Sequence, residues 1–242
     1  RSSIFLMGAL VARTKKAKIS FPGGCDIGAR PIDLHIKALN SLNVKTVIEN
    51  GDIECFTDKV KGTKITLDFP SVGATENAML CAVLGEGKTE IRNSAREPEI
   101  VDLMKFLNSM GAKISGAGTN NIIIKGVEKL KDLSYNIIPD RIEAGTYTII
   151  GALLGNKLKI SGIIEDHIDA LLSKLKEMGV PIEVDNGELI ISKPKEYKAI
   201  NVKTLVFPGF ATDLGQPMSV LLTQADGMSI FEETIYENRF QN

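Results

Sequence analysis

Apolar positions along the chain follow two different periods. Across residues 168–175, Ile and Leu side chains recur three and four positions apart, which predicts one face of a helix. Residues 121–125, Asn-Ile-Ile-Ile-Lys, and 188–192, Glu-Leu-Ile-Ile-Ser, are short apolar runs that follow Gly- or Asn-containing turns. Such runs are typical of the second strand of a hairpin. The two periods together predict a mixed α/β protein.

An internal repeat organises these elements. Similar six-residue segments begin at Leu39, Leu107 and Leu175, so they are 68 positions apart. Each segment ends a predicted helix near Gly or Asn and leads into a hairpin. The repeating unit is helix, strand, strand, strand, helix, strand, and a period of this length favours compact subdomains over a solenoid. The second helices of the unit are expected to begin near residues 72–75, 144–146 and 213–215.

The ends of the chain do not coincide with the ends of a repeat. Residues 1–13 have helical character and align with the second helix of the unit, whereas residues 237–242 end where the first helix of a further copy is expected. This predicts that the 242 residues are an internal fragment of a longer protein. The intact mass of the natural gene product checks this prediction.

Composition narrows the classes of partner. With 43% hydrophobic and 24% charged residues, the chain is expected to be a soluble globular protein of one or two domains. The 29 Lys and Arg residues are balanced by 30 Asp and Glu residues, so no overall field favours nucleic acid or an anionic membrane. Trp is absent, and nine Phe and four Tyr residues leave few surfaces for stacking bases. An anionic ligand therefore needs a local cluster of cations.

Cysteine and histidine usage gives no sign of a metal centre. Cys25, Cys55 and Cys81 have no paired spacing, which argues against a disulfide framework and a tetrahedral zinc site. His35 and His167 lie far apart on predicted helices and read as ordinary imidazoles rather than ligands. No apolar stretch approaches the roughly 20 residues of a spanning helix, and no leader-like segment opens the chain. A location in the reducing cytoplasm is expected.

The most distinctive segment is a Gly-rich loop that precedes a predicted helix. Residues 21–35 read Phe-Pro-Gly-Gly-Cys-Asp-Ile-Gly-Ala-Arg-Pro-Ile-Asp-Leu-His. With Ser-Val-Gly-Ala-Thr at 71–75 and Ala-Arg-Glu-Pro-Glu-Ile-Val-Asp at 95–102, this segment resembles the signature of the UDP-N-acetylglucosamine enolpyruvyl transferases. The segments that continue the resemblance, in the same order and across essentially the whole chain, are 139–143, 210–213 and 235–239.

The resemblance implies both a fold and an activity. The implied fold is α/β (α+β), with repeated βαβαββ-like subdomains that form an inside-out α/β barrel. The full-length family has two domains, of which residues 1–138 and 139–242 would be incomplete parts. The implied activity is transfer of the enolpyruvyl group of phosphoenolpyruvate to the 3-hydroxyl of UDP-N-acetylglucosamine, with release of phosphate, in the first committed step of peptidoglycan synthesis. No cofactor, nucleic acid or membrane is implied, and the oligomeric state stays open.

This chemistry needs an acid, a base and cationic phosphate ligands. Phosphoenolpyruvate is a poor acceptor until its C3 is protonated, after which the sugar hydroxyl attacks C2 and phosphate leaves. The resemblance gives Cys25 acid chemistry, adduct formation and a part in product release, and its loop position permits movement. The alternative for Cys25 is a buried apolar filler. Arg30 presents a planar fork of donors suited to phosphate, although an ordinary arginine is a solvated surface charge.

The resemblance places the nucleotide at two predicted helix starts. At the first, Pro and Asp favour the first turn of a helix without any ligand, which is the structural alternative to a uridine pocket. At the second, unpaired N–H groups suit a diphosphate, and the Ser there can equally be only an N-cap. The positions are Pro31, Ile32, Asp33 and Leu34 for the uridine, and Ser71, Val72 and Gly73 for the diphosphate.

Asp213 is the expected base for the sugar hydroxyl, because it matches the aspartate of the family. It also opens a predicted helix, so a capping role is the alternative. Ile235 and Tyr236 resemble positions that contact the sugar mostly through backbone, and an apolar strand end is the alternative for them. Further polar matches, which surface ion pairs explain nearly as well, are Arg1, Glu97, Asp140, Arg141 and Arg239.

The chain departs from the family pattern in two ways. The N-terminal lysine and asparagine of the family and its C-terminal arginine have no counterpart, so the chain alone is expected to be an incomplete catalyst. Phe69, followed by Pro70, stands where some members carry a lysine beside the nucleotide, which predicts apolar packing or a backbone hydrogen bond there.

Three other readings remain open. The sister enolpyruvyl transferase acting on shikimate 3-phosphate shares the implied fold, but the Pro-Gly-Gly-Cys loop argues against it. A non-catalytic UDP-sugar-binding paralogue is the second reading. A cysteine hydrolase is the third, although neither histidine lies in a motif that would supply its base. The Gly-rich residues 115–119 are not a dinucleotide loop, because they are expected in a hairpin turn and not between a strand and a helix.

Overall fold

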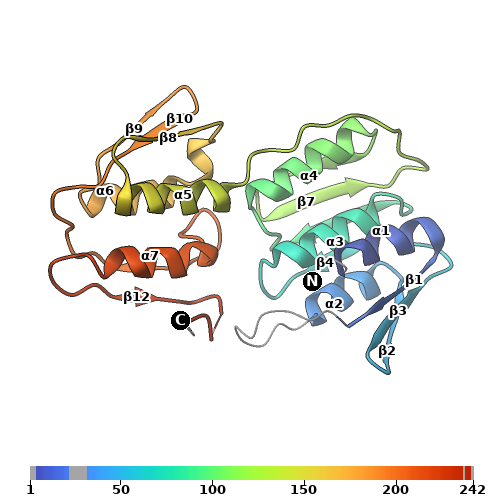
Figure 1. Cartoon of the computed structure of the whole chain (residues 1–242). Coiled ribbons are helices and arrows are strands. Elements are labelled where there is room, and N and C mark those ends of the chain that lie inside the picture. Colours follow the sequence, from blue (N-terminus) through green and yellow to red (C-terminus); the bar gives the residue numbers. More distant parts are fainter. Residues whose placement is uncertain (1–3, 22–31, 237, 241–242) are drawn as a thin grey trace. The chain divides into compact units, whose positions relative to one another are not determined.

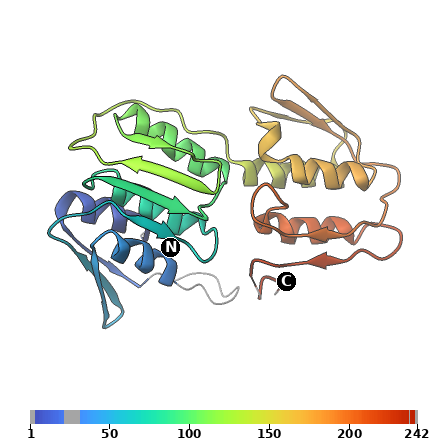
Figure 2. The ribbon, with the colours of Figure 1, turned by 180° about the vertical axis from the view of Figure 1, so that it is seen from behind.

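The computed structural model describes residues 4–21, 32–236 and 238–240 (Figure 1, Figure 2). The helices are α1 (Phe5–Thr14), α2 (Asp33–Ser41), α3 (Val72–Ala82), α4 (Pro98–Ser109), α5 (Arg141–Leu154), α6 (Asp169–Glu177) and α7 (Gly215–Leu222), with short 3-10 turns η2 (Glu165–His167) and η3 (Thr212–Leu214). The strands are β1 (Lys16–Ser20), β2 (Lys45–Glu49), β3 (Asp52–Phe56), β4 (Lys64–Thr66), β5 (Lys88–Arg92), β6 (Lys113–Ser115), β7 (Asn121–Lys125), β8 (Leu158–Ser161), β9 (Ile182–Asp185), β10 (Glu188–Ile191), β11 (Val202–Lys203) and β12 (Phe231–Glu232).

The described residues form two compact units. Unit 1 holds those up to Ile137, and unit 2 begins at Ile138. Each unit has its own core of buried apolar side chains, which extends from Ile4 to Ile124 in unit 1 and from Ile149 to Leu222 in unit 2. Each unit therefore contains the apolar burial that a folded domain needs.

The sheets repeat one pattern of strand pairing. In unit 1, β4 runs parallel to β5, and β5, β7 and β6 pair antiparallel in that order. Because α3 connects β4 to β5 and α4 connects β5 to β6, this sheet and its helices form a βαβαββ subdomain. The order β1-β3-β2 in unit 1 and β8-β10-β9 in unit 2 repeats the three antiparallel strands. The mixed α/β fold of repeated βαβαββ-like subdomains is confirmed in the described residues.

The 68-residue repeat is explained by how three helices end. After α2, α4 and α6 the backbone turns left-handed at Asn43 (φ 65°), Gly111 (φ 101°) and Gly179 (φ 91°). In each case the N–H of the following residue donates to a carbonyl five positions earlier, as from Ala112 to Leu107 O at 3.0 Å. This is the Schellman motif, which satisfies the last helical carbonyls and favours Gly or Asn at the left-handed position. The six-residue segment that recurs in the sequence is therefore the C-terminal end of a helix, formed three times.

The hairpin predictions are confirmed with small shifts. The runs predicted at 121–125 and 188–192 are β7 and, without its last residue, β10. Of residues 115–119, Ser115 ends β6 and the other four lie in the β6–β7 turn. The strand that the repeating unit places after its second helix is, in the last copy, β12, which starts at Phe231 and pairs in parallel with β11.

One predicted strand is wrong. Residues 126–140 contain no strand, although the repeat places the third strand of the middle copy there. This segment instead runs along unit 1, where Lys131 N–H donates to Met110 O at 2.8 Å and the Tyr135 hydroxyl donates to Asp102 Oδ1 at 2.7 Å. It then passes into unit 2 at Ile138. Because the segment leaves one unit for the other, it does not add to the sheet of β8.

Within the described ranges, none of the helices combines the length and the apolar character that crossing a bilayer requires.

Candidate active site

The predicted site residues fall into three groups. Arg1, Cys25, Arg30 and Pro31 lie outside the described residues. In unit 1 the structure describes Ile32, Asp33 and Leu34 at the start of α2, and Ser71, Val72 and Gly73 at the start of α3. In unit 2 it describes Asp213, Ile235 and Tyr236.

At the start of α2, apolar side chains face the core of unit 1 and one acidic side chain faces solvent. Ile32 is the residue before the helix, and its carbonyl accepts the first helical bond from Ile36 N–H at 3.0 Å. Ile32 and Leu34 pack against the core of unit 1, whereas the Asp33 side chain is exposed in the first turn. The carboxylate therefore complements the positive end of the helix and is accessible to a ligand.

Ser71 caps α3. Its Oγ accepts a hydrogen bond from Ala74 N–H at 3.3 Å, so the capping role that the sequence left open is observed. Val72 and Gly73 form the first turn, where backbone N–H groups have no intrahelical acceptor. Phe69, which is 44% exposed, contributes its backbone carbonyl as acceptor for Ser71 N–H at 2.7 Å. The turn before α3 is thus held by backbone and cap, with an exposed aromatic side chain beside it.

The starts of α2 and α3 lie against each other. A Cβ added at Gly73 would be 2.9 Å from His35 Cε1 and 2.9 Å from Phe5 Cε1, so only glycine permits this approach. His35 follows the Asp33–Leu34 turn on α2 and is buried. The structure therefore brings the two predicted nucleotide segments together.

A buried amide fixes this arrangement. Asn77 on α3 accepts from Gly8 N–H at 2.6 Å, donates to Ile4 O at 3.0 Å, and lies 3.1 Å from His35 Nδ1. The two backbone bonds fix which end of the amide is NH₂, and it is this NH₂ that faces His35 Nδ1. Asn77 thus ties α1 and α2 to α3. The sequence pattern does not predict this role, since its only sign is one Asn within a largely apolar helix.

Three carboxyl groups gather where α3 meets α4. Glu97 precedes Pro98 at the start of α4 and is buried, and Glu99 lies in the first turn. Burial, followed by the charges of Glu99 and Glu97, raises the pKa of Glu76 to about 7. This makes Glu76 a group that titrates near neutral pH.

The two described cysteines are buried thiols. Burial raises the pKa of Cys81 to about 12 and also raises that of Cys55, which contacts the Thr46 hydroxyl at 3.7 Å. Both are therefore poor nucleophiles at neutral pH. Both side chains belong to the apolar core of unit 1, which gives them a structural role.

In unit 2 the structure joins the two predicted motif segments. Arg239 Nη2 donates to Asp213 Oδ1 at 2.7 Å, and the Arg239 guanidinium lies 5.7 Å from the centroid of the Tyr236 ring. The Arg239 side chain is only 10% exposed, whereas that of Asp213 is 55% exposed. Gln216 accepts from Arg239 Nε at 3.3 Å. The guanidinium is thus fixed, and the carboxylate that it orients faces solvent.

Asp140 and Arg141 have local partners. Asp140 Oδ1 caps α5 by accepting from Ile142 N–H at 2.7 Å and Glu143 N–H at 3.2 Å. Arg141 lies over the Phe207 ring at 5.6 Å. These contacts account for both residues without a ligand.

Glu233 is a second residue that sequence analysis missed. It follows β12 and accepts hydrogen bonds from Thr204, Thr212 and the backbone of Ile235 and Tyr236. The sequence signal for Glu233 is weak because Glu232 is adjacent to it. Only the alternation of side chains along a strand distinguishes the half-buried Glu233 from the exposed Glu232.

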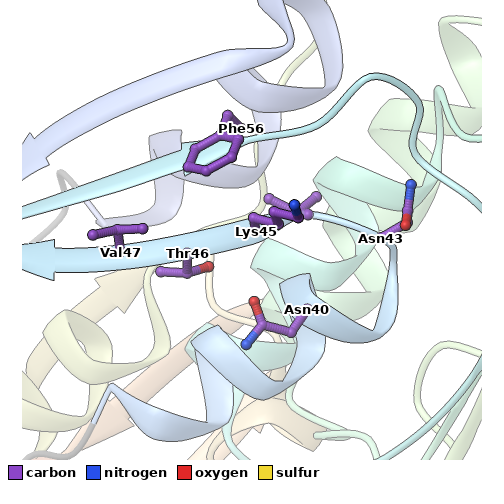
Figure 3. A pocket seen from close by; sticks show the side chains of 7 residues that line it. Asn40, Asn43, Lys45, Thr46, Val47 and Phe56 are labelled. Atoms are coloured by element: carbon purple, nitrogen blue, oxygen red, sulfur yellow. The ribbon is translucent and has the colours of Figure 1, made fainter.

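Two cavities, one in each unit, are lined by residues other than the predicted site residues that the structure describes. A cavity of about 400 Å³ in unit 1 lies between the last turn of α2 and the β2–β3 hairpin (Figure 3). Another of about 530 Å³ in unit 2 lies beside α6 and β11. No group of three His, Cys, Asp or Glu side chains that could hold a metal ion occurs among the residues that the structure describes.

The fold matches solved enolpyruvyl transferases. The structure of the enolpyruvyl transferase NikO from Streptomyces tendae superposes with a TM-score of 0.86 at 23% identity, covering 99% of this chain and 58% of that one. EPSP synthase from Acinetobacter baumannii gives a TM-score of 0.61 at 18% identity, covering 95% of this chain and 54% of that one. The class of fold is therefore that of the enolpyruvyl transferases.

The sequence comparisons give the family. The model of EPSP synthase (3-phosphoshikimate 1-carboxyvinyltransferase) matches residues 1–242, and the chain belongs to this family. It is 54% identical over 242 residues to UDP-N-acetylglucosamine 1-carboxyvinyltransferase 2 of Caldanaerobacter subterraneus, covering 100% of this chain and 58% of that protein. It is 51% identical to the protein of the same name from Bacillus subtilis, covering 100% of this chain and 57% of that protein. The chain thus spans less than two thirds of the relatives that it matches.

Proposed function

We propose that the protein containing this chain transfers the enolpyruvyl group of phosphoenolpyruvate to the 3-hydroxyl of UDP-N-acetylglucosamine and releases phosphate. The observation that carries this proposal is the identity of 50–54% along the whole chain to relatives named UDP-N-acetylglucosamine 1-carboxyvinyltransferase. The reaction is an addition followed by an elimination. C3 of phosphoenolpyruvate gains a proton, the sugar oxygen bonds to C2, and loss of phosphate and of a C3 proton restores the double bond.

In unit 1 the proposed role is nucleotide binding. Ile32, Asp33 and Leu34, with Pro31 before them, take the uridine, and Ser71, Val72 and Gly73 take the diphosphate at the start of α3. The first-turn N–H groups and the positive end of an 11-residue helix support the diphosphate role. The Ser71 cap pairs Ala74 N–H and leaves the N–H groups of Val72 and Gly73 without an intrahelical acceptor, so the cap and the ligand role are compatible.

In unit 2 the proposed role is activation of the sugar hydroxyl. Asp213 takes the hydroxyl proton as the oxygen attacks C2, and Ile235 and Tyr236 contact the sugar. The exposed Asp213 carboxylate, oriented by a fixed guanidinium, supports this role. Outside the described residues, Cys25 is proposed as the acid, and Arg30 and Arg1 as ligands of the anionic substrates.

The further context is proposed on the same basis. The product belongs to peptidoglycan synthesis, and the free buried thiols Cys55 and Cys81 suit a reducing cytoplasm. Residues 1–138 and 139–242 are proposed as parts of the two domains of the whole protein, with no cofactor required by the chemistry.

Phosphate release tests the proposed function. The full-length natural protein is incubated with phosphoenolpyruvate alone, with UDP-N-acetylglucosamine, and with shikimate 3-phosphate. Release that depends on the UDP-sugar is expected. Phosphate release that depends on shikimate 3-phosphate would replace the proposed reaction by that of 3-phosphoshikimate 1-carboxyvinyltransferase, which the family model describes. No phosphate release with either acceptor would favour a non-catalytic binding protein.

Asp213→Asn tests the base. Because the amide cannot accept the hydroxyl proton, turnover is expected to fall by about 10²- to 10⁴-fold, while binding of UDP-N-acetylglucosamine measured by calorimetry stays unchanged. Asp226→Asn, at an exposed aspartate after α7, is the matched control. Full turnover in Asp213→Asn would remove Asp213 from the mechanism.

A further inference from the structure

We infer that Glu233 is a positioning residue of the proposed site in unit 2, holding the Asp213 turn and the Ile235–Tyr236 segment in one geometry. This inference rests on the proposed function for its kinetic consequences. Its structural content is independent of the substrate.

The carboxylate of Glu233 collects four donors. Oε1 accepts from the Thr204 hydroxyl at 2.9 Å, from Ile235 N–H at 2.7 Å and from Tyr236 N–H at 3.1 Å. Oε2 accepts from the Thr212 hydroxyl at 2.8 Å. Thr212 is the residue before Asp213, so one carboxylate joins the segment of the proposed base to the backbone of the proposed sugar contacts.

The partners of Glu233 are themselves fixed. Thr204 is fully buried, and its hydroxyl also accepts from Thr234 N–H at 2.8 Å. A Cβ added at Gly215, the first residue of α7, would lie 3.9 Å from Glu233 Oε2, which places the carboxylate at the positive end of that helix. Figure 1 shows β12 and α7 as neighbouring elements of unit 2. The carboxylate is therefore embedded in a rigid frame.

Loss of this carboxylate would release two backbone N–H groups that precede Arg239, the partner of Asp213. Displacement of a catalytic group by about 1 Å can lower a rate by about 10²-fold. A contribution to stability alone would not act on one substrate selectively. The pattern of kinetic change thus separates positioning from folding.

The test compares three variants of the full-length protein. Glu233→Ala removes all four acceptor contacts, whereas Glu233→Gln can keep most of them, because its carbonyl oxygen has two lone pairs for the donors at Oε1 and its NH₂ can donate to the Thr212 hydroxyl. Glu232→Gln alters the neighbouring exposed carboxylate, which pairs with Lys203 at 2.8 Å, and is the matched control.

Glu233→Ala is expected to lower kcat by about tenfold or more and to raise KM for UDP-N-acetylglucosamine by about fivefold, with KM for phosphoenolpyruvate unchanged. Glu233→Gln is expected to stay within about threefold of the control, since the hydrogen bonds and not the charge position the segment. Equal KM values in Glu233→Ala and Glu232→Gln would overturn the inference, as would a Glu233→Gln variant as impaired as Glu233→Ala.

Amide hydrogen exchange makes the test independent of the substrate. In Glu233→Ala the Ile235 and Tyr236 amides are expected to exchange about tenfold faster than in Glu232→Gln, without a matching change in the core of unit 2. Unchanged exchange overturns the inference even if the proposed reaction is correct. Faster exchange in a protein that lacks UDP-sugar-dependent phosphate release would support the holding role and reject the proposed function alone.

Discussion

Glu76 is a single residue whose ionisation is expected to govern how stability depends on pH. Burial and the neighbouring Glu99 and Glu97 charges raise its pKa to about 7, from an ordinary value of 4.5. The folded protein then binds a proton that the unfolded chain has lost, so stability falls as pH rises from about 4.5 to about 7 and is level above that. Removing the carboxylate should remove this slope.

Glu76→Gln is expected to be more stable than the original protein at pH 8, by up to about 3 kcal/mol, and equally stable at pH 4.5. Urea unfolding across this range measures the difference. Glu49→Gln, at an exposed position at the end of β2, should keep the same pH dependence as the original protein, because it retains Glu76. If the free energies of unfolding of Glu76→Gln and the original protein change with pH in parallel, Glu76 does not titrate in the pH range tested.

Residues whose partners are local could be predicted from sequence, whereas those with distant partners could not. Ser71 caps α3 through an N–H group three positions away and stands out as a helix start. Asp140 caps α5 just as locally, but the sequence pattern predicts that helix start near residues 144–146 and does not single out the cap. The partners of Asn77 lie 69 and 73 positions earlier, and Thr204 lies 29 positions before Glu233. Because such pairs form only when the fold brings elements together, chain patterns carry no direct sign of them.

At the scale of elements, Gly111 should be the most sensitive of the three helix ends. Its φ of 101° is strained for any residue with a Cβ, and a Cβ there would meet no atom within 4 Å, so strain is the only cost. Gly111→Ala is expected to lower the free energy of unfolding by about 1–2 kcal/mol. Gly111→Asn should cost less, because Asn tolerates this conformation and occupies the equivalent position 43. Thermal unfolding of both variants checks the order, and equal losses would contradict it.

The same helix ends show why elements were more predictable than their pairing. A Schellman motif needs Gly or Asn at one place and apolar residues around it, so the sequence reveals it each time. The strands β11 and β12 pair in parallel, and α7 separates them along the chain. Each has only two residues, which are too few to show the alternation of apolar and polar side chains that reveals a strand. The strandless segment 126–140 is set by the passage from one unit to the next, which the repeat does not encode.

At the scale of the whole molecule, the two cores share no residue, which predicts that damage to one unit is confined to it. Leu39 and Leu175 are equivalent in the repeat, fully buried, and belong to the cores of unit 1 and unit 2. Truncation of either to Ala leaves a cavity and is expected to cost about 2–5 kcal/mol. In Leu175→Ala, amide exchange should accelerate in unit 2 and not in unit 1, and Leu39→Ala should give the reverse. Acceleration of both cores by either variant would mean that the chain unfolds as one cooperative body, and the division at Ile137 would then describe packing but not stability.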